Sequence, residues 1–167
     1  MSTVAVRPAT VEDVPVLALL VAALRAHQKD PIGDLNEAAL RRDGFGEHPE
    51  FSVLIAERDR RPIGYALFLD AYEPAFAAKG LYLADLYVRP EARRSGAGRA
   101  LVAGVAAAAS ERGRRFVWWT SLATNTEAHA FYGRLGAIRH DVRAHALVMH
   151  AFDSLATAHA GREAGAS

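Results

Sequence analysis

A short, arginine-rich loop with two glycines leads into a helical pattern near the middle of the chain. Gly96 and Gly98 lack a Cβ atom, so the backbone there can approach a ligand closely. The first N–H groups of a helix have no intrahelical partner, and the helix dipole adds partial positive charge. Arg93, Arg94 and Arg99 bring formal charge to the same place. This combination suits a pyrophosphate, and the alternative is a solvated, arginine-rich helix end.

Two common nucleotide-binding patterns do not fit this loop. The chain contains no Gly-x-x-x-x-Gly-Lys sequence, which excludes a P-loop of the usual kind. Gly96 and Gly98 are followed by Leu101 where the dinucleotide fingerprint needs its third glycine. Neither pattern therefore accounts for the loop, and both a pyrophosphate of another kind of ligand and a solvated helix end remain open at this point.

The loop must be positioned by the elements on either side of it. Residues 81–88 form an apolar run that Pro90 ends, and residues 98–112 repeat their apolar positions at helical spacing. Residues 11–27 predict an amphipathic helix, capped by Thr10. The other predicted elements are strands at 4–7, 51–57, 62–69, 116–120, 138–142 and 146–150, with helices at 34–42, capped by Asp34, and at 124–135, opened by a Thr124–Glu127 capping box.

Composition limits the class of protein. The chain has 167 residues, which we expect to form a single domain over 1–167, with a disordered tail at about 157–167. With 20 basic and 19 acidic residues, it lacks the overall charge of a nucleic-acid-binding protein. It has no cysteine, and its histidines form no metal-ligand set. Its apolar runs are too short to span a bilayer, so we expect a soluble, cytoplasmic protein without metal, membrane or nucleic-acid partners.

The loop and a second segment resemble a known family. The sequence Arg93-x-x-Gly96-x-Gly98 resembles the coenzyme-A motif of the GNAT acetyltransferases, and residues 125–137 resemble the second motif of that family. Residues 43–49 and the segment Tyr82-Leu83-x-Asp85 resemble, more narrowly, the diamine (spermidine/spermine) N1-acetyltransferase branch. The resemblance runs from residue 4 to about residue 155.

The resemblance implies a fold and a co-substrate. The fold is α+β, with a mixed, mostly antiparallel sheet of about six or seven strands flanked by about four helices. Acetyl-CoA would lie in a splay between the fourth and fifth strands. The residues that the resemblance assigns to it are Leu86, Tyr87, Val88, Arg93, Arg94, Ser95, Gly96, Ala97, Gly98, Arg99, Asn125 and Tyr132.

Tyr132 is the candidate proton donor. By resemblance, its phenol protonates the departing CoA thiolate, a role that a neutral hydroxyl can fill. The alternative is a tyrosine that only packs its helix, beside Phe131 and Leu135. Asn125 has two open interpretations, a contact to the CoA arm or a helix cap.

The general base is where the chain departs from the diamine branch. That branch has a glutamate at the position of Ala84, and alanine cannot accept a proton. Asp85 and Glu73 are candidate replacements, followed by Glu47 and His48. Strand alternation would place residues 84 and 85 on opposite faces, which argues against a simple replacement of one by the other. A base is also dispensable if enough free amine is present.

The expected activity is N-acetylation of a primary amine on a small molecule. The region 26–40 is less acidic than a polyamine site requires, which favours a short amine or a lysine- or thialysine-like side chain. Two alternatives are protein or antibiotic acetylation on the same fold and a non-catalytic acyl-CoA sensor. The resemblance also implies a homodimer.

Overall fold

The computed structural model describes residues 3–28 and 35–164. The chain divides into two compact units, of which the first ends at Leu122 and the second begins at Ala123. The elements of the first unit are β1 (Ala5–Pro8), η1 (Val11–Asp13), α1 (Val14–Gln28), α2 (Glu37–Phe45), β2 (Ser52–Arg58), β3 (Arg61–Glu73), η2 (Pro74–Phe76), β4 (Ala78–Val88), η3 (Pro90–Ala92), α3 (Ala97–Glu111) and β5 (Val117–Trp118). Those of the second unit are α4 (Thr126–Arg134) and α5 (Met149–Ala164).

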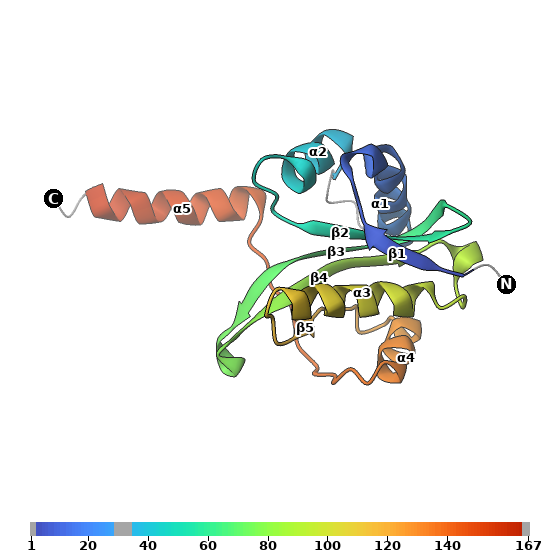
Figure 1. Ribbon diagram of the computed structural model, residues 1–167. Coiled ribbons are helices and arrows are strands. Elements are labelled where there is room, and N and C mark those ends of the chain that lie inside the picture. The colour runs from blue at the N-terminus through green and yellow to red at the C-terminus, as the bar shows by residue number, and fades with distance from the viewer. Residues whose placement is uncertain (1–2, 29–34, 165–167) are drawn as a thin grey trace. The chain divides into compact units, whose positions relative to one another are not determined.

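The first unit is a three-layer α+β arrangement around one sheet. The sheet has five strands in the order β1-β2-β3-β4-β5. Neighbouring strands are antiparallel from β1 to β4, whereas β4 and β5 run parallel. Helices α1 and α2 cover one face and α3 covers the other (Figure 1). The α+β class is confirmed, but the predicted count of six or seven strands is too high.

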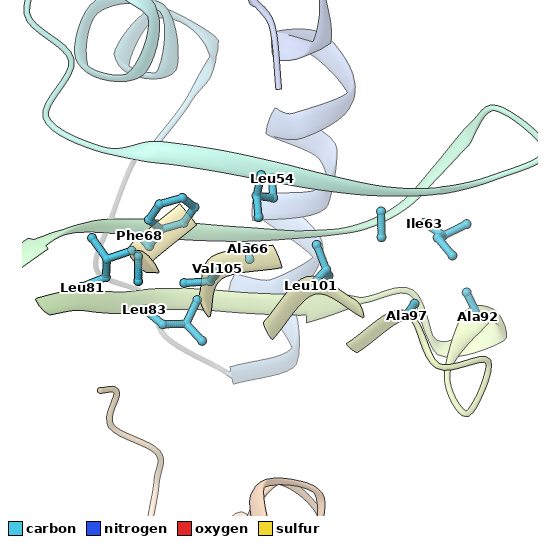
Figure 2. Packing of buried hydrophobic residues seen from close by; sticks show 12 residues of the cluster. Leu54, Ile63, Ala66, Phe68, Leu81, Leu83, Ala92, Ala97, Leu101 and Val105 are labelled. Atoms are coloured by element: carbon cyan, nitrogen blue, oxygen red, sulfur yellow. The ribbon is translucent and has the colours of Figure 1, made fainter. Parts of the chain in front are cut away.

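Each face of the sheet has its own hydrophobic core. We call them the α3-side core and the α1-side core. Figure 2 shows the α3-side core, in which Leu101 and Val105 of α3 lie against Phe68 of β3 and Leu83 of β4. The α1-side core consists of Val14, Leu17, Leu20, Val21, Leu24, Leu40, Val53, Tyr65, Leu67 and Tyr87. Five of these belong to α1 at helical spacing, which is why the amphipathic pattern predicted that helix correctly.

Helix α3 lies close to the sheet at the points where small residues alternate with Leu101 and Val105 on its contact face. A Cβ atom added at Gly104 would stand 2.9 Å from a methyl of Leu54 and 3.2 Å from one of Val6. Ala97 at the start of the helix is also buried. This close packing holds the first turn of α3 next to the end of β4, where the glycine-rich loop joins them.

An ion-pair network ties the start of α1 to the sheet. The guanidinium of Arg7 on β1 donates to Asp13 at 2.7 and 2.8 Å, and to Glu57 on β2 at 2.6 Å. Asp13 also accepts a hydrogen bond from the backbone N–H of Thr10 at 2.8 Å, as expected for the predicted cap. The hydrogen bonds from Arg7 are the main reason that the pKa of Asp13 is lowered to about 2.

This network predicts a pH-dependent contribution to stability. The folded pKa of Asp13, about 2, lies below the value near 3.9 of an unfolded chain, so folding favours the ionised carboxylate. Its contribution should be complete above pH 4 and lost as the pH falls towards 2. We expect Asp13→Asn to lower the free energy of unfolding by about 1 to 2 kcal/mol at pH 7. Urea titrations at both pH values check this, and an equal deficit at pH 2 would contradict it.

The structure corrects the prediction for the C-terminal segment. Strands were expected at 138–142 and 146–150, but residues 137–148 form no regular element and α5 begins at Met149. Gly136, with φ +82°, ends α4, and the alternating apolar residues beyond it pair with no described strand. The segment 149–164 contains many good helix formers, so local helix propensity prevails over a short alternating pattern. The described part of the expected tail, 157–164, is helical.

Two smaller differences concern helix ends. Helix α2 continues to Phe45, past the expected end near residue 42, and an added Cβ atom at Gly44 within it would clash with the ring of Phe51. Its cap is Asn36, whose side chain accepts from the N–H of Ala39 at 3.0 Å, while the predicted cap Asp34 lies outside the described residues. Helix α4 is capped one residue later than predicted, by Asn125.

Candidate functional site

The loop between η3 and α3 has the backbone form of an anion site. Gly96 is the residue before the helix and has φ +88°, and Arg94 also has a positive φ of 60°. Among the described residues, no acceptor is bonded to the backbone N–H of Arg94, Ser95 or Gly96. The side chain of Ser95 instead donates to the carbonyl of Ala92 at 2.7 Å and so tightens the turn. Free N–H groups at a helix start are the donors that a phosphate group requires.

Three guanidinium groups surround this loop. Arg94 and Arg99 are exposed, and Arg93 is half-buried. Arg93 folds back so that its Nε donates to the carbonyl of Val88 at 3.3 Å. Within the described part of the chain, none of the three pairs with a carboxylate. Their positive charge is therefore available to a ligand.

The strand that leads into the loop has an open edge. Strands β4 and β5 pair only at Leu81 with Val117 and at Tyr82 with Trp118. From residue 83 to residue 88, β4 is paired with β3 on one side and with no described strand on the other. The predicted splay corresponds to this stretch. Hydrogen-bonding groups alternate along a strand, and the N–H of Arg89 donates to Ile63 of β3, so the backbone groups of Tyr87 also face β3. Those of Leu86 and Val88 face the free edge, where an extended ligand could bond.

A β-bulge changes the face on which the candidate base lies. Leu67 pairs with Asp85 but Phe68 pairs with Leu83, so Ala84 is an extra residue in β4. Leu83 belongs to the α3-side core, whereas Tyr87 belongs to the α1-side core, so the alternation changes phase at Ala84. The simple alternation that separated residues 84 and 85 is therefore wrong here.

Asp85 faces the side of the sheet covered by α1. Its cross-strand partner Leu67 belongs to the α1-side core, and its carboxylate accepts a hydrogen bond from the hydroxyl of Tyr65 at 2.9 Å. The side chain is half-buried, so it can be reached from solvent. The chain thus places a carboxylate one residue before the stretch 86–88 and next to the bulge.

The other candidate bases lie elsewhere. Glu73 ends β3, where its carboxylate accepts from the N–H of Ala75 at 3.0 Å and caps η2. Since Asp85 pairs with Leu67, residues 67 to 73 of β3 separate the two carboxylates by about 20 Å. Glu47 and His48 are exposed in the connection between α2 and β2. The structure therefore does not bring Glu73 and Asp85 to one site.

The second unit contains the two remaining predicted residues. The side chain of Asn125 accepts from the N–H of Ala128 at 3.1 Å, so its role as a helix cap is observed. Tyr132 lies near the end of α4, half-buried, with its ring 5.2 Å from that of Phe131. Burial raises the pKa of Tyr132, which keeps its phenol protonated at neutral pH.

Sequence reasoning missed one residue of this site. Tyr65 lies in the strand predicted at 62–69 and was given no role from the sequence, although its hydroxyl donates to Asp85. The available signal was a single tyrosine in a buried run, because a buried hydroxyl needs a hydrogen-bond partner.

Neither a helix able to cross a bilayer nor a cluster of three potential metal ligands occurs within 3–28 and 35–164.

Comparisons with known proteins agree with this geometry. A thialysine N-epsilon-acetyltransferase of Sus scrofa is 33% identical over 147 residues, covering 82% of this chain and 85% of the relative. An L-ornithine N5-acetyltransferase of Arabidopsis thaliana is 35% identical over 74 residues, covering 44% and 32%. Among solved structures, an integron cassette protein of V. cholerae has a TM-score of 0.75 at 22% identity, covering 93% of this chain and 98% of that one. An aminoglycoside acetyltransferase from a soil metagenome has a TM-score of 0.73 at 17% identity, covering 87% and 97%.

The family itself is given by the match along the sequence. The model of the acetyltransferase (GNAT) family matches residues 18–137, a range that includes the glycine-rich loop, the open edge of β4 and helix α4. The chain therefore belongs to the GNAT family of acetyltransferases.

Proposed function

We propose that the protein is an acetyl-CoA-dependent N-acetyltransferase that acts on a primary amine of a small molecule, with the side-chain amine of a basic amino acid as the preferred acceptor. The observation that carries this proposal is the loop of Arg94, Ser95 and Gly96, with its free N–H groups, between the open edge of β4 and the start of α3.

The residues of the loop fit the phosphate part of acetyl-CoA. The N–H groups of residues 94–99 would bond the pyrophosphate, with charge from Arg93, Arg94 and Arg99. The free edge of β4 at residues 86–88 would bond the pantetheine arm through its backbone. Asn125 would contact the same arm with the part of its amide that the helix cap leaves free. When bound, acetyl-CoA supplies the acetyl group as a reactive thioester.

The chemistry requires one group that takes a proton and one that gives a proton. The amine nitrogen forms a bond to the acetyl carbon while the carbon–sulfur bond breaks. Tyr132 would donate its phenolic proton to the departing sulfur, and its raised pKa keeps that proton available. Asp85 would accept the proton that the amine loses, and its place beside residues 86–88 supports it over the distant Glu73. A backbone N–H at the bulge would polarise the thioester carbonyl.

The names of the relatives support a basic amino acid as acceptor. One acts on thialysine and another on ornithine, and each of these molecules carries one side-chain amine. A polyamine site would need several carboxylates along a groove. Asp85 lies in β4 itself, directly before residues 86–88, which would hold acetyl-CoA. Its carboxylate is on the α1-covered face, where it accepts a hydrogen bond from Tyr65. One fixed carboxylate matches one reacting amine.

The test is release of CoA thiol from acetyl-CoA in the presence of single amines. Thialysine, lysine, ornithine, spermidine, an aminoglycoside and a lysine-containing peptide form the panel. The protein has no cysteine, so a thiol-reactive dye gives no signal from the enzyme. We expect the highest kcat/KM for a free basic amino acid. A preference for the peptide or the aminoglycoside would overturn the acceptor class, and binding of acetyl-CoA without any turnover would favour the sensor function.

We also propose that the chain is one acetyltransferase domain and assembles as a homodimer. The family match at 18–137 covers most of the first compact unit and continues to residue 137 of the second, which supports a single functional domain. Several apolar side chains of the segment 138–155 are exposed, including Ile138, Val142, Leu147 and Phe152. A second copy that covers this segment would remove them from water. Light scattering should give about twice 18.0 kDa, and a monomer mass would contradict the dimer.

A further inference from the structure

Tyr65 combines complete burial with a hydrogen bond to a reachable carboxylate. Its side chain is 0% exposed in the α1-side core. Its hydroxyl donates to Oδ2 of Asp85 at 2.9 Å, and the two residues are 20 positions apart in the sequence. Within the described part of the chain, the hydroxyl of Tyr65 is the one group that hydrogen-bonds to the carboxylate of Asp85. Oδ1 therefore keeps its capacity to accept a hydrogen bond, and the residue is half-buried and not closed off from solvent.

The sheet fixes the position of the phenol. Tyr65 pairs with Tyr87 across β3 and β4, and Asp85 pairs with Leu67 two residues further along β3. The bulge at Ala84 puts Asp85 on the same face as both tyrosines, whose ring centroids are 6.4 Å apart. Strand pairing and core packing thus fix the position of the Tyr65 hydroxyl, and the hydrogen bond from this hydroxyl fixes the carboxylate of Asp85.

The phenol of Tyr65 keeps its proton at neutral pH. Burial is the main reason that the pKa of Tyr65 is raised, and the negative charge of Asp85 adds to the effect. The charge of Arg25 on α1 acts on Tyr65 in the opposite direction, but the net shift is upward. A protonated phenol is a permanent donor, so the orientation of Asp85 does not depend on the protonation of Tyr65.

A purely structural hydrogen bond is the alternative explanation. A buried hydroxyl does need a partner, but a backbone carbonyl would serve and would stay buried with it. Here the partner is ionisable, half-buried and next to the strand end at residues 86–88. A carboxylate held at one oxygen presents the other in a fixed direction, which favours the geometry needed for reaction.

We propose that Tyr65 is a positioning residue for amine acetylation, fixing Asp85 through Oδ2 so that Oδ1 accepts a hydrogen bond from the acceptor amine. This inference rests on the proposed function, since it assumes that an amine is acetylated beside Asp85. Tyr65 itself touches neither substrate.

A double-mutant cycle between Tyr65→Phe and Asp85→Ala tests this role. We expect Tyr65→Phe alone to lower kcat/KM for the amine about tenfold, the effect of losing one hydrogen bond to a charged group, with KM for acetyl-CoA unchanged. Asp85→Ala should lower kcat/KM at least as much. In the Asp85→Ala background, Tyr65→Phe should cause no further loss of kcat/KM and should raise Tm, because it removes a buried hydroxyl left without a partner.

A matched control separates positioning from general loosening of the core. Val53→Ala thins the same α1-side core without touching Asp85, so its effects should add to those of Asp85→Ala. If Tyr65→Phe lowers kcat/KM equally in both backgrounds, or raises KM for acetyl-CoA, it acts through the fold and the positioning role is overturned. If the wild type acetylates an amine and the Tyr65→Phe variant has the same kcat/KM, this inference alone is overturned. If the wild type acetylates none of the amines, the proposed function is overturned.

Discussion

Replacing Tyr132 by Phe is expected to lower kcat for amine acetylation at least about a hundredfold, the usual size of a general-acid contribution. Phenylalanine keeps the ring that packs beside Phe131 and removes only the phenolic O–H. The departing thiolate would then have to take its proton from water. Initial rates with a thiol-reactive dye measure kcat, and calorimetric titration measures the affinity for acetyl-CoA, which should stay within about twofold.

Tyr82→Phe is the matched control for this loss. It removes the same hydroxyl from a tyrosine that shares a hydrogen bond with the hydroxyl of Thr120 at 3.3 Å and has no assigned part in the reaction. Its kcat should remain close to that of the wild type. If Tyr132→Phe were equally active, the thiolate would be protonated by another group, and Tyr132 would be a packing residue of α4. A parallel loss of acetyl-CoA affinity would instead point to a binding role.

Gly96→Ala should weaken acetyl-CoA binding about thirtyfold, which corresponds to about 2 kcal/mol. At φ +88° a Cβ atom costs about 1 to 2 kcal/mol in the backbone, and relief of that strain turns the loop N–H groups away from the pyrophosphate. The added methyl meets no protein atom within 4 Å, so the effect does not come from a clash inside the protein. The Kd from calorimetry and KM for acetyl-CoA should rise together, with kcat at saturation changed little.

Gly113, just beyond the other end of α3, provides a control that also has a positive φ. Its φ is 66°, and an added Cβ there meets no atom within 4 Å. Gly113→Ala should therefore lower the free energy of unfolding by about the same amount as Gly96→Ala, about 1 kcal/mol. Only the variant at the glycine-rich loop should lose affinity for acetyl-CoA. Equal losses at both ends would mean that strain in α3 weakens binding, and the loop would not be the phosphate site.

The two assignments concern different kinetic constants, which makes them separable. A proton donor used only in the transition state changes kcat, while a phosphate-binding loop used in both states changes KM. If Tyr132→Phe raised KM for acetyl-CoA and Gly96→Ala lowered kcat, both assignments would be wrong. The amine panel then decides whether the loss of glutamate at Ala84 has altered the acceptor or removed the reaction.

Much of the site could be predicted because its signals are local. The glycine at 96, the arginines around it and the apolar spacing of α3 lie within a few turns of one another, and local spacing encodes local structure. The same holds for α1, whose buried residues repeat every three or four positions. The C-terminal strands were wrong because short alternating apolar runs form strands only when a partner strand is available.

The face of Asp85 could not be predicted because it depends on pairing between strands. A single extra residue at Ala84 reverses the alternation along β4, and no residue type near it signals the bulge. The contact with Tyr65 depends in turn on that register, since the two residues meet only when β3 and β4 align.

The sequence by itself determined the family, the glycine-rich loop proposed to bind the pyrophosphate and the helix that follows it, since each depends on residues close together in the chain. Only the tertiary structure decided which carboxylate stands beside the strand end, and that a buried tyrosine holds it. The physical reason is that strand register is a long-range property, set by the summed packing of both cores and not by any one segment.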